Sequence, residues 1–196
     1  MKEKYKYIKN LLSLDVAEFI TFTSLTFYLN DKKVDKIDDQ VPLSFSMHSS
    51  YYPLYRHLLY FLKPRLEKES QLELNPIYSY SRFYLTGANL VKHTDRPACE
   101  ISVSLTLKYK YKNKNYKWPL CMENTPIIIE PGDGVLYKGR EIEHWRPIFT
   151  EPDGSWHHQV FLHYVNKNGP CKNLKEEVDN KTQRFNNKEQ KKINNY

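Results

Sequence analysis

The chain has 196 residues, of which 40% are hydrophobic and 27% charged, so it is long enough for one domain with its own core. Its net charge is +7, but residues 166–196 carry eight Lys/Arg and four Asp/Glu, which account for +4 of it. Charge gathered in one terminal segment argues against a strongly basic nucleic-acid-binding surface on the rest of the chain.

The sequence contains no signal for a membrane or for secretion. No run of 18 apolar residues predicts a transmembrane helix, and the basic start MKEKYKYIKNLL is not followed by the apolar segment of a signal peptide. Cys99, Cys121 and Cys171 show no paired spacing, which is typical of a reducing compartment. We therefore expect a cytoplasmic protein without a membrane partner.

Two helices are predicted in the first 70 residues. Residues 13–29 follow a potential cap, Ser13, and place apolar side chains on one broad face, although their Thr and Phe content leaves a strand open for the second half. Residues 30–42 form a polar connection. Residues 50–63 are amphipathic, with Pro53 in the first turn and Pro64 ending or kinking the helix. Their apolar stripe consists of Leu54, Tyr55, Leu58, Leu59 and Leu62.

After residue 75 the hydrophobic period shortens to that of strands. Turn residues separate seven segments that are predicted to be strands: 79–87, 88–95, 100–111, 116–123, 125–139, 141–149 and 157–165. Helices followed by a run of strands predict an α+β fold whose strands close into a sandwich or barrel, with the helices packed on the sheet. We expect one domain over 1–165, with helical support in 1–70 and a β core in 75–165, followed by a polar basic tail, 166–196.

The pattern with the most chemical information is His93-Thr94-Asp95, followed by His144. Residues two apart on a strand point to the same face, so His93 and Asp95 can reach one ion. The 49 positions from Asp95 to His144 allow several strands to return the chain to that ion. Two imidazoles and one carboxylate are the facial triad that holds Fe(II) with three open positions. A helical H-x-x-x-H pair, which indicates a zinc peptidase, does not occur.

Three segments around these residues resemble 2-oxoglutarate/Fe(II) dioxygenases of the prolyl-4-hydroxylase type. They are RFYLTGANLVKHTD, PGDGVLYKGREIEH and SWHHQVFLHYVN, and the resemblance spans residues 75–166. It implies a double-stranded β-helix, or jelly roll, in which His93, Asp95 and His144 bind Fe(II). It also implies O2 and 2-oxoglutarate as cosubstrates, with decarboxylation to succinate and CO2 coupled to hydroxylation of a substrate C–H bond.

The chain departs from that family at the residue that binds the C5 carboxylate of 2-oxoglutarate. A Lys or Arg on the last strand usually pairs with the C5 carboxylate there, whereas the matching position here is His157. Arg146 lies two residues past His144 on the same face and is a second candidate, and Arg96, directly after Asp95, is a third. We favour His157, which binds a carboxylate less rigidly than a guanidinium does.

The resemblance assigns two more contacts to 2-oxoglutarate. Tyr84 matches a family tyrosine that hydrogen-bonds it, unless this is an ordinary core tyrosine. Thr106 lies on the hydroxyl face of a strand whose other face is apolar. Period-2 alternation alone allows that hydroxyl face to be wet. The resemblance instead implies that this hydroxyl face points into the cavity, with Thr106 near the C5 carboxylate of 2-oxoglutarate.

Three functions follow as hypotheses. The first is a hydroxylase acting on a peptidyl residue such as proline, or on a small molecule. The second is a nucleic-acid oxidative demethylase or hydroxylase on the same core, which needs a basic groove and is not favoured by the charge distribution. The third is a non-catalytic metal-binding module, favoured only by the missing Lys or Arg on the last strand. A fold does not decide between substrates.

Overall fold

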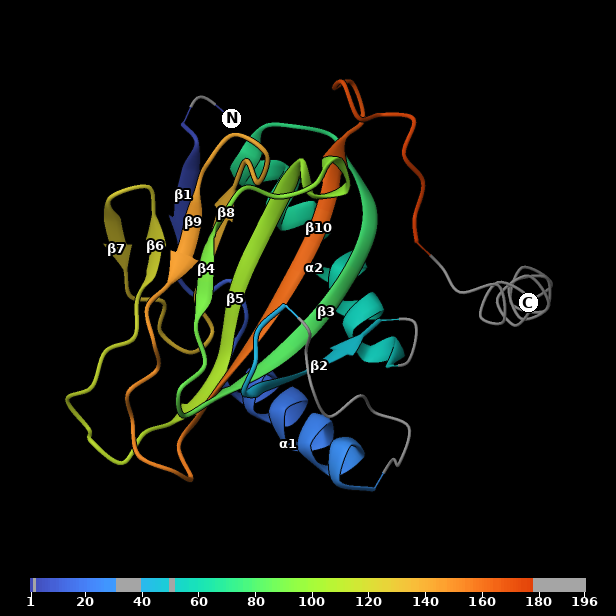
Figure 1. Ribbon diagram of the computed structural model, residues 1–196. Helices are drawn as coiled ribbons and strands as arrows, with labels where there is room; N and C mark the ends of the chain where they lie inside the picture. Colours follow the sequence, from blue (N-terminus) through green and yellow to red (C-terminus); the bar gives the residue numbers. More distant parts are fainter. Residues whose placement is uncertain (2, 31–39, 50–51, 178–196) are drawn as a thin grey trace, which may run out of the picture.

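Two facing antiparallel sheets form the centre of the computed structural model, which describes residues 1, 3–30, 40–49 and 52–177 (Figure 1). The larger sheet has the order β1-β8-β5-β10-β3-β2 and the smaller one the order β4-β9-β6-β7. The larger sheet comprises β1 (Tyr5–Ile8), β2 (Ser44–His48), β3 (Leu74–Leu85), β5 (Ile101–Lys110), β8 (Gly134–Tyr137) and β10 (Trp156–Asn166). The smaller sheet comprises β4 (Leu90–His93), β6 (Leu120–Met122), β7 (Thr125–Ile127) and β9 (His144–Arg146). A short 3-10 helix, η1 (Pro97–Cys99), precedes β5. This is the predicted jelly roll.

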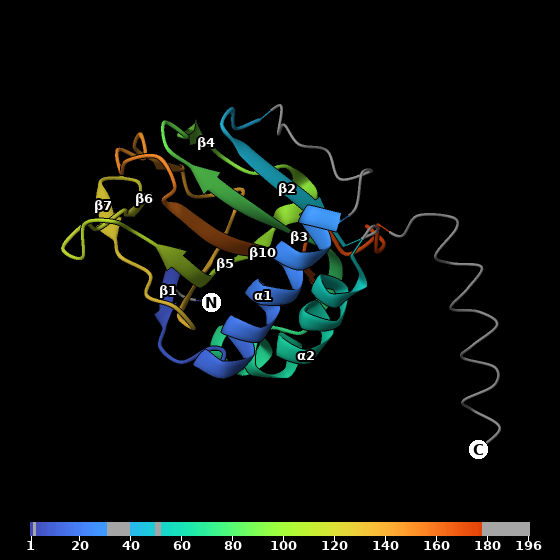
Figure 2. The same ribbon diagram turned by 90° about the horizontal axis from the view of Figure 1, so that it is seen from below.

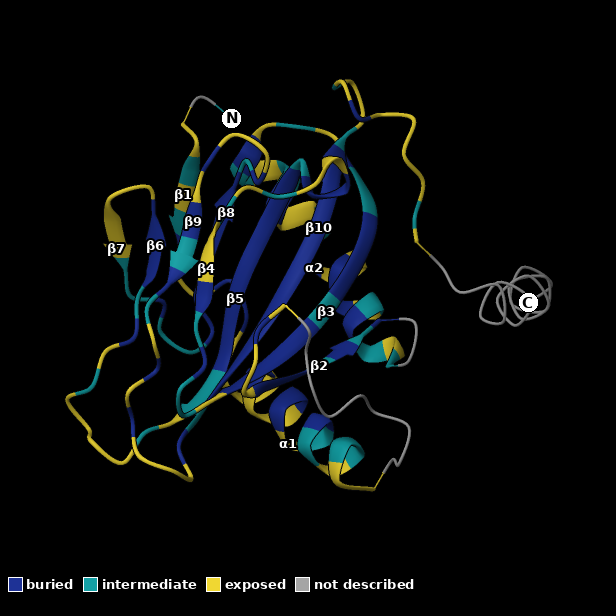
Figure 3. Cartoon of the chain, in the orientation of Figure 1, coloured by how far each residue is buried: buried dark blue, intermediate teal, exposed yellow. Residues whose placement is uncertain are grey.

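Both helices cover the outer face of the larger sheet. Helices α1 (Leu14–Asn30) and α2 (Pro53–Ser70) lie side by side beneath β3, β5 and β10 in Figure 2. The main core lies between these layers and includes Leu59 and Leu66 of α2 with Val103 and Leu105 of β5. Strands β5 and β10 are buried along most of their length, whereas much of α1 is exposed (Figure 3). No helix within the described ranges is both long enough and apolar enough to span a membrane.

Strand β5 divides its side chains between two environments. Its apolar residues pack into the helical core, and its hydroxyl residues, Ser102, Ser104 and Thr106, turn between the sheets. All three are completely buried and bond to side chains of β10. The hydroxyl groups of β5 therefore point inward, and the alternative that they face solvent, which alternation alone allowed, is wrong.

The predicted helices form, with two differences. The strand alternative for the second half of 13–29 is wrong, because α1 is helical to Asn30. The second helix does not end at Pro64 but continues to Ser70. Leu62 and Leu66 are buried on either side of Pro64, and their packing outweighs a proline's cost of about 3 kcal/mol in a helix interior.

Each of the seven predicted strand segments contains a strand, and segment 125–139 contains two, β7 and β8. The short edge strands β1 and β2 were not predicted. Beyond β10, the described start of the expected tail packs on the domain. Glu176 bonds to Arg56 at 2.6 Å and to Tyr60 at 2.5 Å, and the Glu177 amide donates to the Ile77 carbonyl at 2.8 Å. Residues 178–196 of the expected tail lie outside the described residues.

Candidate metal centre

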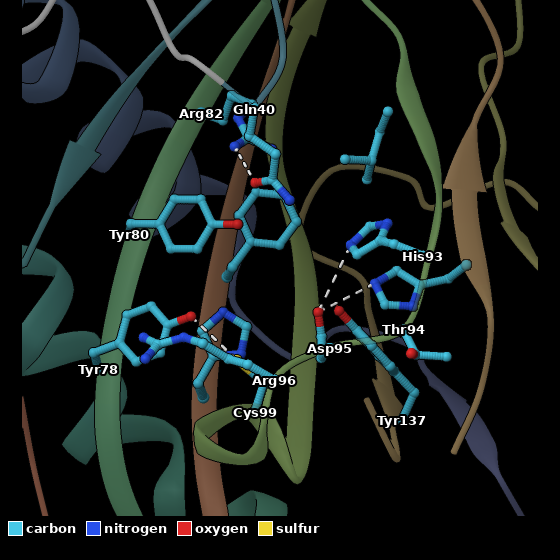
Figure 4. A pocket seen from close by; sticks show the side chains of 14 residues that line it. Gln40, Tyr78, Tyr80, Arg82, His93, Thr94, Asp95, Arg96, Cys99 and Tyr137 are labelled. Atoms are coloured by element: carbon cyan, nitrogen blue, oxygen red, sulfur yellow. Dashed lines mark hydrogen bonds and ion pairs between the residues drawn. The ribbon is translucent and has the colours of Figure 1, made fainter. Parts of the chain in front are cut away.

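His93, Asp95 and His144 converge at one end of the space between the sheets (Figure 4). His93 ends β4 and His144 begins β9, and the two residues are register partners in this antiparallel pair. Their Nε2 atoms lie 3.7 Å and 3.6 Å from Asp95 Oδ1. One potential ligand atom of each residue therefore lies within 4.8 Å of the other two. Strand pairing thus brings His93 and His144 together, and Asp95, two residues beyond the end of β4, completes the predicted ligand set.

Hydrogen bonds fix which nitrogen of each imidazole faces the centre. His93 Nδ1 lies 2.9 Å from the Val91 carbonyl, and His144 Nδ1 lies 3.1 Å from the Ile142 carbonyl. A carbonyl only accepts, so both Nδ1 atoms carry a proton, and the Nε2 atom of each ring, when neutral, is the one that presents a lone pair. Burial lowers the pKa of His144, which favours the neutral, ligating imidazole. This donor set fits a divalent metal ion such as Fe(II).

The carboxylate of Asp95 is held by its surroundings. The Asp95 amide donates to the Gly139 carbonyl at 2.8 Å, and Ser102 Oγ donates to Asp95 Oδ2 at 3.1 Å. A Cβ at Gly139 would lie 2.3 Å from Asp95 Oδ2 and 2.4 Å from the Cys99 carbonyl. The chain therefore needs glycine at 139 to let this carboxylate reach the centre.

A cavity of about 240 Å³ adjoins the three ligands. Figure 4 shows the imidazole and carboxylate groups facing an aromatic wall from β3 and β10, with Arg82 above it. Tyr80 stacks on Phe161 with ring centroids 4.7 Å apart, and Tyr78 stacks on His163 at 4.4 Å. The cavity is large enough for a small carboxylate ligand beside the metal.

The four residues predicted to contact 2-oxoglutarate gather in one cluster, and none of them is among the residues that line this cavity. Three of them meet the side-chain oxygen of Gln159, with Thr106 at 3.1 Å, His157 at 2.8 Å and Arg146 at 3.0 Å. Tyr84 packs beside them, its ring 5.8 Å from the Arg146 guanidinium carbon. Four strands thus supply one polar cluster, which we call the Gln159 cluster.

His157, the favoured candidate for binding the C5 carboxylate, differs in charge from Arg146, the second candidate. Burial lowers the pKa of His157 well below its ordinary value, with the Arg146 charge adding to the effect, so His157 is neutral. Burial also lowers the pKa of Arg146, yet a guanidinium stays protonated at neutral pH. Within the described residues no carboxylate forms an ion pair with Arg146. The Gln159 cluster therefore holds a buried cation that no carboxylate of the described residues pairs with.

The other arginines differ in position. Arg96, the third candidate, is exposed, lines the cavity and pairs with Glu177 through bonds of 2.8 Å and 2.9 Å. Arg82, which sequence reasoning did not single out, is buried, lines the cavity and donates to Gln40 and to the Tyr84 hydroxyl. Its two-residue spacing from Tyr84 on β3 was the signal that could have found it.

No family model matches the sequence, and a search of curated proteins finds no match either. Solved structures do match the fold. A prolyl-4-hydroxylase from Pseudomonas putida has a TM-score of 0.63 at 14% identity, covering 84% of this chain and 94% of that one. HygX from Streptomyces hygroscopicus, with nickel and 2-oxoglutarate bound, has 0.60 at 10%, covering 90% and 92%. The α-ketoglutarate-dependent epimerase SnoN has 0.65 at 8%, covering 84% and 78%. The chain therefore has the fold of 2-oxoglutarate-dependent oxygenases.

Proposed function

We propose that this chain is an Fe(II)- and 2-oxoglutarate-dependent oxygenase that hydroxylates a substrate C–H bond and releases succinate and CO2. The observation that carries this proposal is the convergence of the Nε2 atoms of His93 and His144 on Asp95 within an oxygenase fold. Three protein ligands on one side of an ion leave positions open for the cosubstrate and O2. The bound iron would supply the oxygen-activating chemistry.

The chain's own residues would bind and orient the reactants. His93, Asp95 and His144 hold the ion, and Ser102 keeps the second carboxylate oxygen of Asp95 engaged. The Gln159 cluster would receive the C5 carboxylate, because its uncompensated Arg146 charge gains most from an anion. Neutral His157 and Thr106 would add hydrogen bonds, and Tyr84 would close the pocket beside them. The wall of Tyr80 and Phe161 would exclude water.

The prime substrate is proposed only as a class. A peptidyl residue such as proline and a small molecule both remain consistent with a fold shared by a prolyl-4-hydroxylase and HygX. A nucleic-acid demethylase or hydroxylase is the alternative, but the charge outside residues 166–196 is only +3 and gives it little support. A non-catalytic metal-binding module is the third possibility, and a turnover assay separates it from the others.

The test measures succinate formed from 2-oxoglutarate with Fe(II), including turnover without a prime substrate. We expect His93→Ala, Asp95→Ala and His144→Ala each to abolish Fe(II) binding or turnover, because each removes one of three ligands. His57→Ala, on the exposed side of α2, is the matched control and should remain active. Full activity in any one of the three variants would contradict the iron site. Iron binding without any succinate would favour the non-catalytic module.

A further inference from the structure

A second group of metal-binding side chains shares Asp95 with the candidate iron centre. Cys99 from η1 and His163 from β10 each place one potential ligand atom within 4.8 Å of the other and of an Asp95 oxygen. Both side chains line the same cavity as the iron ligands (Figure 4 labels Cys99). Cys99 is 2% exposed and His163 is 3% exposed, and only Asp95 of the three is partly exposed.

His163 has an unused coordination atom. Its Nδ1 bonds to Ser102 Oγ at 2.9 Å, whereas its buried Nε2 has no hydrogen-bond partner within the described part of the chain. A buried nitrogen without a partner costs free energy, which a ligand to that ring would offset. Ser102 also bonds to Asp95 Oδ2 at 3.1 Å, so one hydroxyl holds two members of the group in place.

The mixture of donors differs from that of the iron centre. Sulfur, imidazole nitrogen and carboxylate oxygen together are a ligand set of Zn²⁺, and a thiolate favours Zn²⁺ over Fe(II). Zn–S and Zn–N bonds of about 2.3 Å and 2.0 Å place neighbouring donors roughly 3.5 Å apart in a tetrahedral site. The three potential ligand atoms lie at most 4.8 Å apart, so each would have to move by about 1 Å to reach that spacing.

We propose that Asp95, Cys99 and His163 form a second metal site, which binds a thiophilic divalent ion such as Zn²⁺. Binding forms a metal–sulfur bond and releases the Cys99 thiol proton to solvent. Because Asp95 belongs to both sets, an ion bound here competes with the iron centre for that carboxylate. The site itself does not depend on oxygenase activity, so its failure and that of the proposed function are distinguishable.

The test uses Co²⁺ as a spectroscopic probe in the full chain carrying His93→Ala and His144→Ala, which lack the imidazoles of the iron centre. This variant should bind one Co²⁺ per chain and show the near-ultraviolet charge-transfer band of a thiolate–cobalt bond. Adding Cys99→Ser should remove the band and weaken Co²⁺ binding by about tenfold or more. Cys121→Ser, which alters another buried thiol, is the matched control and should retain both.

His163→Gln in the same background is the second variant, should Cys99→Ser fail to fold. It should also weaken Co²⁺ binding by about tenfold or more, because it removes the imidazole ligand. Absence of the thiolate band in the starting variant would overturn the proposal. Persistence of the band in Cys99→Ser would do the same, because the sulfur would then come from another residue.

Discussion

At the scale of single residues, Arg146 and His157 both bond to Gln159 but differ in charge. A hydrogen bond from a charged group contributes about 1.5–3 kcal/mol, and one between neutral groups about 0.5–1.5 kcal/mol. We therefore expect Arg146→Met to raise the KM for 2-oxoglutarate by about 10- to 150-fold. His157→Ala should raise it by about 2- to 12-fold on the same scale.

Steady-state kinetics with varied 2-oxoglutarate, supported by calorimetric binding of 2-oxoglutarate to metal-loaded protein, measures both effects. Arg96→Met is the control, since Arg96 is exposed and already paired with Glu177. A larger effect of His157→Ala than of Arg146→Met would show that the imidazole is the main carboxylate contact. No effect of either variant would place the C5 carboxylate elsewhere, with Arg82 the next residue to test.

Gly139 supports the metal centre both by accepting a hydrogen bond from the Asp95 amide and by leaving room for the Asp95 carboxylate. A methyl group at this position would meet Asp95 Oδ2 at 2.3 Å, so Gly139→Ala should displace the carboxylate and weaken Fe(II) binding by about tenfold or more. Gly154→Ala is the control because it also adds a methyl group, at a φ of +87°, with its closest contact at 3.7 Å. It should cost about 1–2 kcal/mol of stability without changing metal affinity. Equal metal affinities in both variants would contradict this role of Gly139.

At the scale of elements, α2 contributes to stability through one face. Leu59 is completely buried, whereas Phe61, two residues on, is 71% exposed. Leu59→Ala should lower the free energy of unfolding by about 2–5 kcal/mol, because it removes buried methyl groups and leaves a cavity. Phe61→Ala should change it by no more than about 0.5 kcal/mol. Denaturant unfolding of the two variants measures the difference, and similar losses would mean that α2 packs differently.

Periodicity could predict the elements that bury a continuous face. The stripe of Leu58, Leu59 and Leu62 and the alternation along β5 both reflect such a face, so α2 and the central strands were predictable. The end of α2 was not, because burial of Leu66 beyond Pro64 is a tertiary effect. The edge strands β1 and β2 were not predicted, because they stand alone beside the helices, outside the run of turn-separated segments that indicated the other short strands.

The candidate site also has features that the sequence could predict and features that only the folded structure shows. His93 and Asp95 are two residues apart, so they could be predicted as a local pair of ligands. Strand alternation does not place Asp95, because β4 ends at His93 and Asp95 lies beyond it. Pairing of His144 with His93 needed the family resemblance, because residues this far apart meet only in the folded sheet. The roles of Arg82 and of the Gln159 cluster depend on four strands at once. Alternation alone could not show that β5 turns its hydroxyl groups inward.

At the scale of the whole molecule, the fold buries several histidine side chains in its interior. His158 lies between α1 and the larger sheet, bonded to Thr21 at 2.9 Å and stacked on Phe83 at 3.8 Å. Burial holds the pKa of His158 well below its ordinary value of 6.5, and the same is true of His157. In the unfolded chain both imidazoles take up a proton below about pH 6.5. The unfolded state therefore binds more protons than the folded state in that range.

The direction in which stability changes with pH follows from this difference in bound protons. Stability is complete above the unfolded pKa of about 6.5 and falls as the pH decreases, by about 1.4 kcal/mol per pH unit for each buried neutral histidine. Carboxylates such as Glu67 and Glu130, whose pKa values are lowered from 4.5, lose their contribution only below that value. Between pH 6.5 and pH 4.5 the loss of stability therefore reports mainly the histidines.

Denaturant unfolding of metal-free protein at several pH values between 6.5 and 5 tests this interpretation. His158→Asn should reduce the slope of unfolding free energy against pH by about 1.4 kcal/mol per pH unit, because one proton-binding difference is removed. It also loses the contact with Phe83 at every pH, so the slope and not the level is the informative quantity. His57→Asn, on the exposed surface of α2, should leave the slope unchanged. An unchanged slope in His158→Asn would mean that this imidazole takes up a proton in the folded chain as well.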